Sequence, residues 1–518
     1  MSHTDPEGGR RVDPAVGPSD RLGACACRCG GNRWSTTIDL RGVWDVKPKA
    51  RNETSVNKII SVLVPVGSLG VGVRVEEVKR GIAAGADVIA LDAGSTDSGA
   101  AYLATGVAKY NREAIKRDLL VLMAAQAEAG IPLLIGSCGQ SGNDIAVSWV
   151  RDIAVEVAAE LDISPRIAVL YSEQDPRAVK AQNARGRIRP LAPAGPLTDA
   201  TIDRCAHIVA MMGPEPYMAA LRAGADIVLG GRTTDTAVLA AVPLMRGAGI
   251  ASSWHAGKIG ECGGQCAVNS SGASGVLMRI GSDSFEIEPL SPTERCDVRS
   301  VSGHMLYENS NPFRLTEPGG VLDVTTANYQ PVDERTVRVT GSRWEAMPYT
   351  MKLEGAGPGP FQTIMIIGIE DPEVLASLDL FHDRLHAALI QRIEDTFGNE
   401  AGEYDISLRF YGWNAVSGLQ VPKGTAAPRE VGVLFVASAS TQSLATRMAK
   451  ACNPYFFHFP LNRGKDLPSY AFPFSPSEVE RGPVYLFHLN HVVTVDDPLE
   501  LVRTEWLDLG VRSSAVHG

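Results

Sequence analysis

Residues 82–100, IAAGADVIALDAGSTDSGA, decide the fold of this chain, because a helix end, a buried strand and a polar loop follow one another there. The same order returns at residues 221–237, LRAGADIVLGGRTTDTA. Both stretches share Ala-Gly-Ala-Asp, a short apolar run and a later Thr-Asp step. The repeat therefore predicts one strand–loop–helix unit that is used twice, with Gly85 and Gly224 ending the helices before it.

Short β-branched runs alternate with longer amphipathic segments around these two units, which is typical of βα units on a parallel sheet. The candidate strands are residues 59–66, 87–91, 132–137, 166–172, 207–213 and 226–231. We therefore predict an α/β fold with an open, mostly parallel sheet of about six strands and flanking helices, Rossmann-like or flavodoxin-like.

The composition of the sequence changes after about residue 250, where helical segments become rarer and Gly, Ser and Pro become more frequent. Alternating segments at 275–281 and 335–341 indicate strands, and later helices and strands suit an α+β unit. We predict four parts: a disordered N-terminal extension (1–55), an α/β domain with ligand loops at its strand ends (56–249), a β-rich region (250–370) and a smaller C-terminal α+β domain (371–518).

Charge and hydropathy exclude several classes of protein. The net charge is −10 and both signs are spread along the chain, which argues against binding to nucleic acid or to an anionic membrane. No apolar run reaches the roughly 18 to 20 residues that span a bilayer, and the N-terminus lacks the apolar core of a signal peptide. We expect a cytoplasmic protein with a small-molecule substrate and, as the commonest assembly, a homo-oligomer.

Cysteine usage favours neither a disulfide framework nor a zinc site. The nine cysteines are an odd number in a long chain. Cys25, Cys27 and Cys29 crowd into one segment, but no complementary pair lies nearby to complete four ligands. Cys262 and Cys266 likewise lack a following histidine at zinc spacing.

Each candidate strand ends in a polar or glycine-rich loop, and ligands of open parallel sheets bind beyond the carboxyl ends of the strands. The candidate substrate-binding residues in these loops are Gly67, Ser68, Gly70, Ser95, Ser137, Gly139, Asn143, Arg232 and Thr234. The first loop could offer backbone amides to a phosphate such as a CoA pyrophosphate, or be a tight turn. Arg232 could hold a carboxylate or phosphate, or form a salt bridge with a neighbouring loop.

Two carboxyl groups are the candidate catalytic residues. Asp92 stands at a strand end, and Glu261 lies in the glycine-rich segment 257–266, which we expect to be irregular. Either residue could act as an acid or a base. Asp97 and Asp235 either join Asp92 at a ligand or cap the following helices, and capping is the more ordinary role of a Thr-Asp step.

The C-terminal strings NPYFFHFPL and LPSYAFPFSPSEVERGPVYLFHLNHVV, together with GADVIALDAGSTD, GADIVLGGRTTD and ECGGQC, resemble the acyclic terpene utilization AtuA-like family. The resemblance covers roughly residues 57–506. It implies an α/β N-terminal region, a C-terminal α+β extension, and a role in the breakdown of branched or terpenoid acyl-CoA compounds. It does not imply a particular nucleophile.

The polar loops expected at one edge of the sheet and this resemblance together favour an enzyme. We expect a lyase of the hydro-lyase type that acts on a carboxylic acid or its CoA thioester. A second reading is a metal-assisted isomerase or C–C lyase, in which Asp92, Asp97 and Asp235 bind Mg²⁺. A third is a non-catalytic, acyl-CoA-binding subunit of a larger complex, since the chain carries no self-sufficient catalytic motif.

Overall fold

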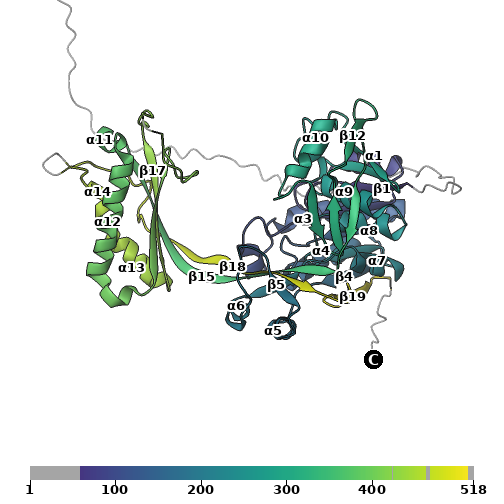
Figure 1. The fold of residues 1–518 in the computed structure, drawn as a ribbon, viewed down its shortest axis with the longest axis horizontal. Coiled ribbons are helices and arrows are strands. Elements are labelled where there is room, and N and C mark those ends of the chain that lie inside the picture. Colours follow the sequence, from purple (N-terminus) through teal and green to yellow (C-terminus); the bar gives the residue numbers. More distant parts are fainter. Residues whose placement is uncertain (1–58, 423, 463–466, 511–518) are drawn as a thin grey trace, which may run out of the picture. The chain divides into compact units, whose positions relative to one another are not determined.

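A computed structural model describes residues 59–422, 424–462 and 467–510. The predicted N-terminal extension and its three cysteines lie outside the described residues. The described chain has a mixed α/β fold with one large mixed sheet and two further sheets that are antiparallel (Figure 1).

Five parallel strands form the centre of the large sheet. In spatial order they are β1 (Ile60–Val64), β2 (Val88–Asp92), β3 (Leu133–Gly136), β7 (Ile227–Gly230) and β4 (Arg166–Tyr171). The repeated sequence unit thus supplies β2 and β7, which lie on either side of β3. This strand order differs from those of doubly wound nucleotide-binding sheets, so the Rossmann-like or flavodoxin-like detail is not confirmed.

Antiparallel strands extend the sheet on both sides. β8 (Val276–Ile280) pairs with β1 and is followed outward by β9 (Ser284–Pro289), β13 (Val337–Thr340) and β12 (Asn328–Pro331). β19 (Arg503–Asp508) pairs with β4 at the other edge. The predicted mostly parallel sheet is therefore confined to the central block, because later parts of the chain add antiparallel neighbours.

Alternation along the central strands divides the core into two layers. Val62, Val88 and Ala90 belong to one apolar cluster, whereas their neighbours Leu63 and Ile89 belong to the other. Successive side chains point to opposite faces of a sheet, so near-continuous apolar strands bury both faces. Helices must then cover both sides, as in other sheets of parallel strands.

The helices between β1 and β10 mostly follow strands of the large sheet in the chain. They are α1 (Val75–Ala83), α2 (Ala101–Thr105), α3 (Arg112–Ala129), α4 (Asp144–Leu161), α5 (Pro176–Ala184), α6 (Asp199–Asp203), α7 (Glu215–Arg222), α8 (Ala237–Met245), α9 (Ile250–Gly260), η1 (Gly263–Cys266), α10 (Val298–Gly303) and η2 (His304–Leu306). Gly85 and Gly224 follow α1 and α7 with φ of 89° and 92°, as predicted for glycines that end helices.

A long strand, β15 (Thr350–Ile369), is the centre of a six-stranded sheet. Its other members are β16 (Tyr404–Tyr411), β17 (Val431–Ala439), β18 (Val479–Thr494) and β5 (Ile188–Pro190), with β6 (His207–Ala210) paired to β15. The prediction that 207–213 joins the parallel sheet was wrong, because β6 pairs with Leu353–Ala356 of β15 instead. A three-stranded sheet contains β10 (Arg314–Glu317), β11 (Gly320–Asp323) and β14 (Arg343–Ala346).

Helices that follow β15 pack on its C-terminal half and on β17. They are α11 (Pro372–Leu375), α12 (Leu378–Phe397), η3 (Gly398–Ala401), α13 (Gln442–Cys452) and α14 (Tyr455–His458). One apolar cluster joins them to the strands, including Phe381, Leu389 and Phe435. The helices and strands predicted near 372–397, 431–439, 441–452 and 484–495 are confirmed as elements, while the predicted domain boundaries stay a prediction.

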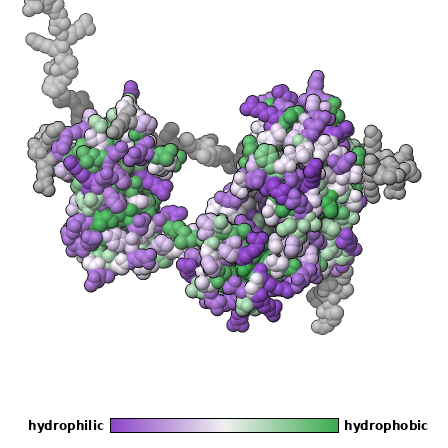
Figure 2. All heavy atoms as spheres, viewed as in Figure 1, coloured by the Kyte–Doolittle hydropathy of each residue, from purple (hydrophilic) through white to green (hydrophobic). Residues whose placement is uncertain are grey.

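No helix among the described residues is both long and apolar enough to cross a bilayer. The visible face of the protein mixes hydrophilic and hydrophobic residues (Figure 2).

Candidate active site

Two adjoining cavities lie at the carboxyl ends of the parallel strands. The larger has a volume of about 440 Å³ and the smaller about 300 Å³. Four acidic residues line both cavities: Asp97, Asp235, Glu261 and Glu308. The cavities therefore form one continuous candidate site with a shared acidic wall.

Asp92 is the last residue of β2 and faces the smaller cavity. Its Oδ2 accepts a hydrogen bond from the amide of Gly94 at 2.8 Å, whereas its buried Oδ1 has no hydrogen-bond partner among the described residues. Gly94 has φ of 150°, and a Cβ there would meet the backbone of Gln140 at 2.6 Å, so only glycine fits this turn. Burial raises the pKa of Asp92 well above its usual range, and the charge of Asp235 raises it further.

Arg232 follows β7 and is buried among the strand-end loops. Its Nε donates to Glu354 at 3.0 Å, and its Nη1 donates to Asp235 at 3.1 Å and to Ser137 at 3.2 Å. Glu354 is on β15, so the guanidinium group of Arg232 connects the parallel strands with the long antiparallel strand. The salt-bridge reading of this arginine is confirmed, while its predicted contact with a substrate stays a prediction.

A close backbone approach sets the position of Arg232. Its amide donates to the carbonyl of Gly142 at 3.1 Å. A Cβ on Gly142 would lie 2.2 Å from that amide nitrogen, and Gly142 has φ of 64°. The glycine thus lets the loops after β3 and β7 meet, which places Arg232 beside Ser137.

Glu261 lies directly after α9 and forms a buried ion pair with Lys258, one helical turn earlier. Both residues line the larger cavity, and Glu261 lines the smaller one too. Burial raises the pKa of Glu261 well above its usual range, although Lys258 acts in the opposite direction. The expectation of an irregular segment from residue 257 was wrong for its first four residues, which complete α9.

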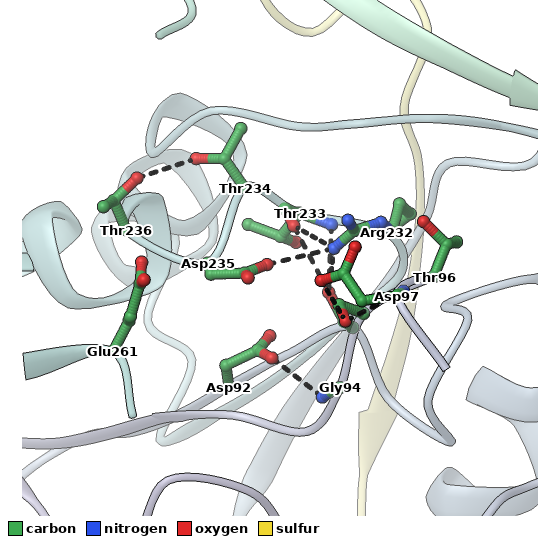
Figure 3. A network of polar contacts seen from close by, with 12 residues as sticks. Asp92, Gly94, Thr96, Asp97, Arg232, Thr233, Thr234, Asp235, Thr236 and Glu261 are labelled. Carbon is green, nitrogen blue, oxygen red and sulfur yellow. Dashed lines mark hydrogen bonds and ion pairs between the residues drawn. The ribbon is translucent and has the colours of Figure 1, made fainter. Parts of the chain in front are cut away.

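Asp97 and Asp235 do not cap the helices that follow them, contrary to the favoured prediction. Neither α2 nor α8 has a side-chain hydrogen bond at its N-cap, and the N-cap residues are Ala100 and Thr236. Asp235 instead binds Arg232, and Asp97 accepts a hydrogen bond from Ser95 Oγ at 2.8 Å. Figure 3 shows Asp97 and Asp235 next to Arg232, with Asp92 and Glu261 farther from the guanidinium group; all four acidic residues line the smaller cavity.

Much of the sequence, including most residues that line the cavities, matches the model of a known protein family. The model of the acyclic terpene utilisation family protein AtuA matches residues 71–469. This chain belongs to the AtuA family. Comparison with curated proteins and with solved structures gave no match.

The AtuA match contains the acidic wall of the site but begins within the first loop and ends before β18. Asp92, Arg232 and Glu261 lie inside it, whereas Gly67 and Ser68 lie outside. The C-terminal string 467–493, which carried much of the resemblance, falls almost wholly beyond the match. The family match thus includes four of the five central strands, β2, β3, β4 and β7, together with the later elements as far as α14.

The structure brings seven of the eleven candidate site residues to the AtuA cavities. Gly67, Ser68, Asp92 and Ser95 line the smaller one, Arg232 and Thr234 line the larger one, and Glu261 lines both.

 Five of these seven come from the strand-end loops, Asp92 is the last residue of β2, and Glu261 follows α9. The remaining four candidates, Gly70, Ser137, Gly139 and Asn143, do not line either cavity.

The first loop, between β1 and α1, binds a carboxylate of the protein itself. The amides of Gly70, Gly72 and Val73 donate to the buried carboxyl group of Asp118 on α3, at 2.7, 3.2 and 2.8 Å. From the sequence, the amides of this loop were candidates for binding a phosphate. Asn143 is likewise engaged, because its Oδ1 accepts from the amide of Ala146 at the start of α4.

Sequence reasoning missed the residues that enter the site from distant elements. Lys258 could have been found from its spacing of three residues before Glu261, had the helix been recognised. Glu308, Glu317 and Glu354 carry no local signal, because their place in the site depends on how the later strands return to the central sheet.

One group of potential metal ligands in the site comprises Glu261, Cys262 and His304, whose ligand atoms lie within 4.8 Å of one another. Burial and the charge of Lys258 lower the pKa of His304 to about 4. Lys258 forms a buried ion pair with Glu261, so the ammonium group of Lys258 lies beside this group.

Proposed function

We propose that this AtuA-family chain is an enzyme of terpenoid or branched-chain acid breakdown, and that it is a lyase of the hydro-lyase type. Its substrate would be a branched carboxylic acid or the CoA thioester of one. Membership of the acyclic terpene utilisation family supports the substrate class. The reaction type is our inference from the site.

One observation carries the proposal: two buried carboxyl groups, Asp92 and Glu261, border the same small cavity but have different partners. Asp92 has an oxygen without a hydrogen-bond partner among the described residues, so burial favours its protonated form. Lys258 favours the ionised form of Glu261. Two carboxyl groups in unequal environments suit an acid and a base in one reaction.

In this proposal Glu261 removes a proton from the carbon beside the substrate carbonyl, and Asp92 donates a proton to the departing hydroxyl group. A C–H bond and a C–O bond break, a C=C bond forms, and water leaves. Arg232 and Thr234 border the larger cavity, where they would hold the remainder of the substrate.

The test is water addition or removal by the purified chain on a panel of branched 2-enoyl and 3-hydroxyacyl CoA thioesters and the corresponding free acids. Mass spectrometry detects the gain or loss of one water. Asp92→Asn and Glu261→Gln should each lower turnover by about a hundredfold or more, since each removes a general acid or base.

Glu128→Gln on the exposed side of α3 is the matched control, because it removes a carboxylate far from this chemistry and should leave turnover unchanged. Full activity in both site variants would contradict the assigned roles. An inert chain that co-purifies with a fixed partner would favour the non-catalytic subunit instead.

A further inference from the structure

Carboxyl groups outnumber cationic groups in the lining of the smaller cavity. Five line it, those of Asp92, Asp97, Asp235, Glu261 and Glu308, against the ammonium group of Lys109, while Arg232 pairs with Asp235 and Lys258 pairs with Glu261. Like charges at short range repel one another, most strongly where water is excluded. An anionic acid or CoA thioester would also be repelled by this wall unless a cation accompanied it.

Three of these carboxylates come from separate segments and converge. Oxygen atoms of Asp97, Asp235 and Glu308 all lie within 4.8 Å of one another. In a six-coordinate site with metal–oxygen distances of about 2.1 to 2.6 Å, opposite ligands lie about 4 to 5 Å apart. The three carboxylates therefore have the spacing of ligands around one hard cation.

A second observation points to the same place. Asp92 lines this cavity with only 5% of the residue exposed, and its buried Oδ1 has no hydrogen-bond partner among the described residues. A buried polar atom of this kind is rare unless an ion, water or ligand completes it. Figure 3 shows the Asp92 carboxyl group close to that of Asp235.

We propose that Asp97, Asp235 and Glu308 bind one hard divalent cation, Mg²⁺, Mn²⁺ or Ca²⁺, in the wall shared by the two cavities, with Asp92 beside it. An all-oxygen ligand set selects these ions over zinc or copper. The cation offsets the negative wall and lets an anionic substrate approach. Only this last role rests on the proposed function; the binding of the ion does not.

The test is the binding of Mn²⁺ alone to the metal-free full chain, followed by electron paramagnetic resonance of the unbound ion. We expect one site per chain, with Mg²⁺ or Ca²⁺ displacing the Mn²⁺. Asp97→Asn and Glu308→Gln should each weaken binding at least about tenfold, as loss of ligand-shell groups does elsewhere. Both residues are exposed, so these variants should keep the fold.

Asp283→Asn, at an exposed loop position away from the cavities, is the matched control and should bind Mn²⁺ like the unaltered chain. Absence of a stoichiometric site, or equal affinity in Glu308→Gln and the control, would overturn the proposal. The readout needs no substrate, so it stands or falls separately from hydro-lyase activity.

Discussion

At the scale of single residues, two glutamates, Glu354 and Glu317, show how neighbouring groups shift the pKa of a carboxyl group. Burial alone would raise the pKa of Glu354, but Arg232 and Lys352 beside it lower the value to about 2. Burial raises the pKa of Glu317 to about 7, although Thr236 donates a hydrogen bond to it at 2.6 Å. The two pKa values differ because Glu354 has direct cationic partners, whereas Glu317 has none among the described residues.

Glu317 should make the stability of the protein depend on pH. Its pKa rises from 4.5 to about 7 on folding, so the unfolded chain ionises first and the folded state loses stability as the pH rises through this interval. The Glu317→Gln variant lacks this loss. Between pH 4.5 and 7, the unfolding free energy of the unaltered chain should fall relative to that of the variant, by up to about 3 kcal/mol.

Urea unfolding of both chains across this pH range measures the difference. A difference that is constant with pH, or that grows in favour of the unaltered chain, would show that Glu317 does not titrate as described.

At the scale of elements, the loop between β1 and α1 is built around Asp118 rather than around a ligand. Its three amides and the carboxylate lie in one buried cluster. Hydrogen bonds to a charged acceptor are stronger than those between neutral groups. This cluster holds the loop that presents Gly67 and Ser68 to the smaller cavity.

Asp118→Asn should destabilise the chain by at least about 2 kcal/mol, because the variant replaces an acceptor with an amide donor that faces backbone amides. Hydrogen exchange should also accelerate at Gly70 and Val73. Thermal unfolding and exchange mass spectrometry measure the two effects. Glu128→Gln on the same helix is the control, and an unchanged exchange rate in Asp118→Asn would rule out the cluster as the support of the loop.

The sequence predicts most single elements well because their signals are local. The repeat 82–100 and 221–237 gives β2 and β7 with their following loops, and alternation gives β8 and β13. The end of α9 was misjudged because glycines at 257 and 260 suggested an irregular segment. Both pack closely, since a Cβ on Gly257 would meet the backbone of Thr236 at 2.8 Å.

At the scale of the whole molecule, pairing between distant segments lies beyond such local signals. The sequence predicted that strand-end loops converge, and Asp92 and Arg232 do border adjoining cavities. It could not predict that β8, β9, β13 and β12 extend the sheet or that β15 brings Glu354 to Arg232. Those arrangements depend on long-range hydrogen bonding, which leaves no periodic pattern in either segment.

A chain that ends at Val502 should be less stable and less soluble than one that ends at Gly510. The shorter chain lacks β19, so the backbone edge of β4 is uncovered and free to pair with other chains. The longer chain keeps β19 and is the matched control. Melting temperature and sedimentation measure the effect, and equal behaviour of the two chains would show that β19 is dispensable to the sheet.

The pairing of β19 with β4 also has a consequence for biosynthesis. Six residue pairs join the strands, from Arg503 with Tyr171 to Asp508 with Arg166. The ribosome makes β4 long before β19, and domains begin to fold while synthesis continues. The nascent protein must therefore carry an open sheet edge through most of its translation, a period in which chaperones would protect it.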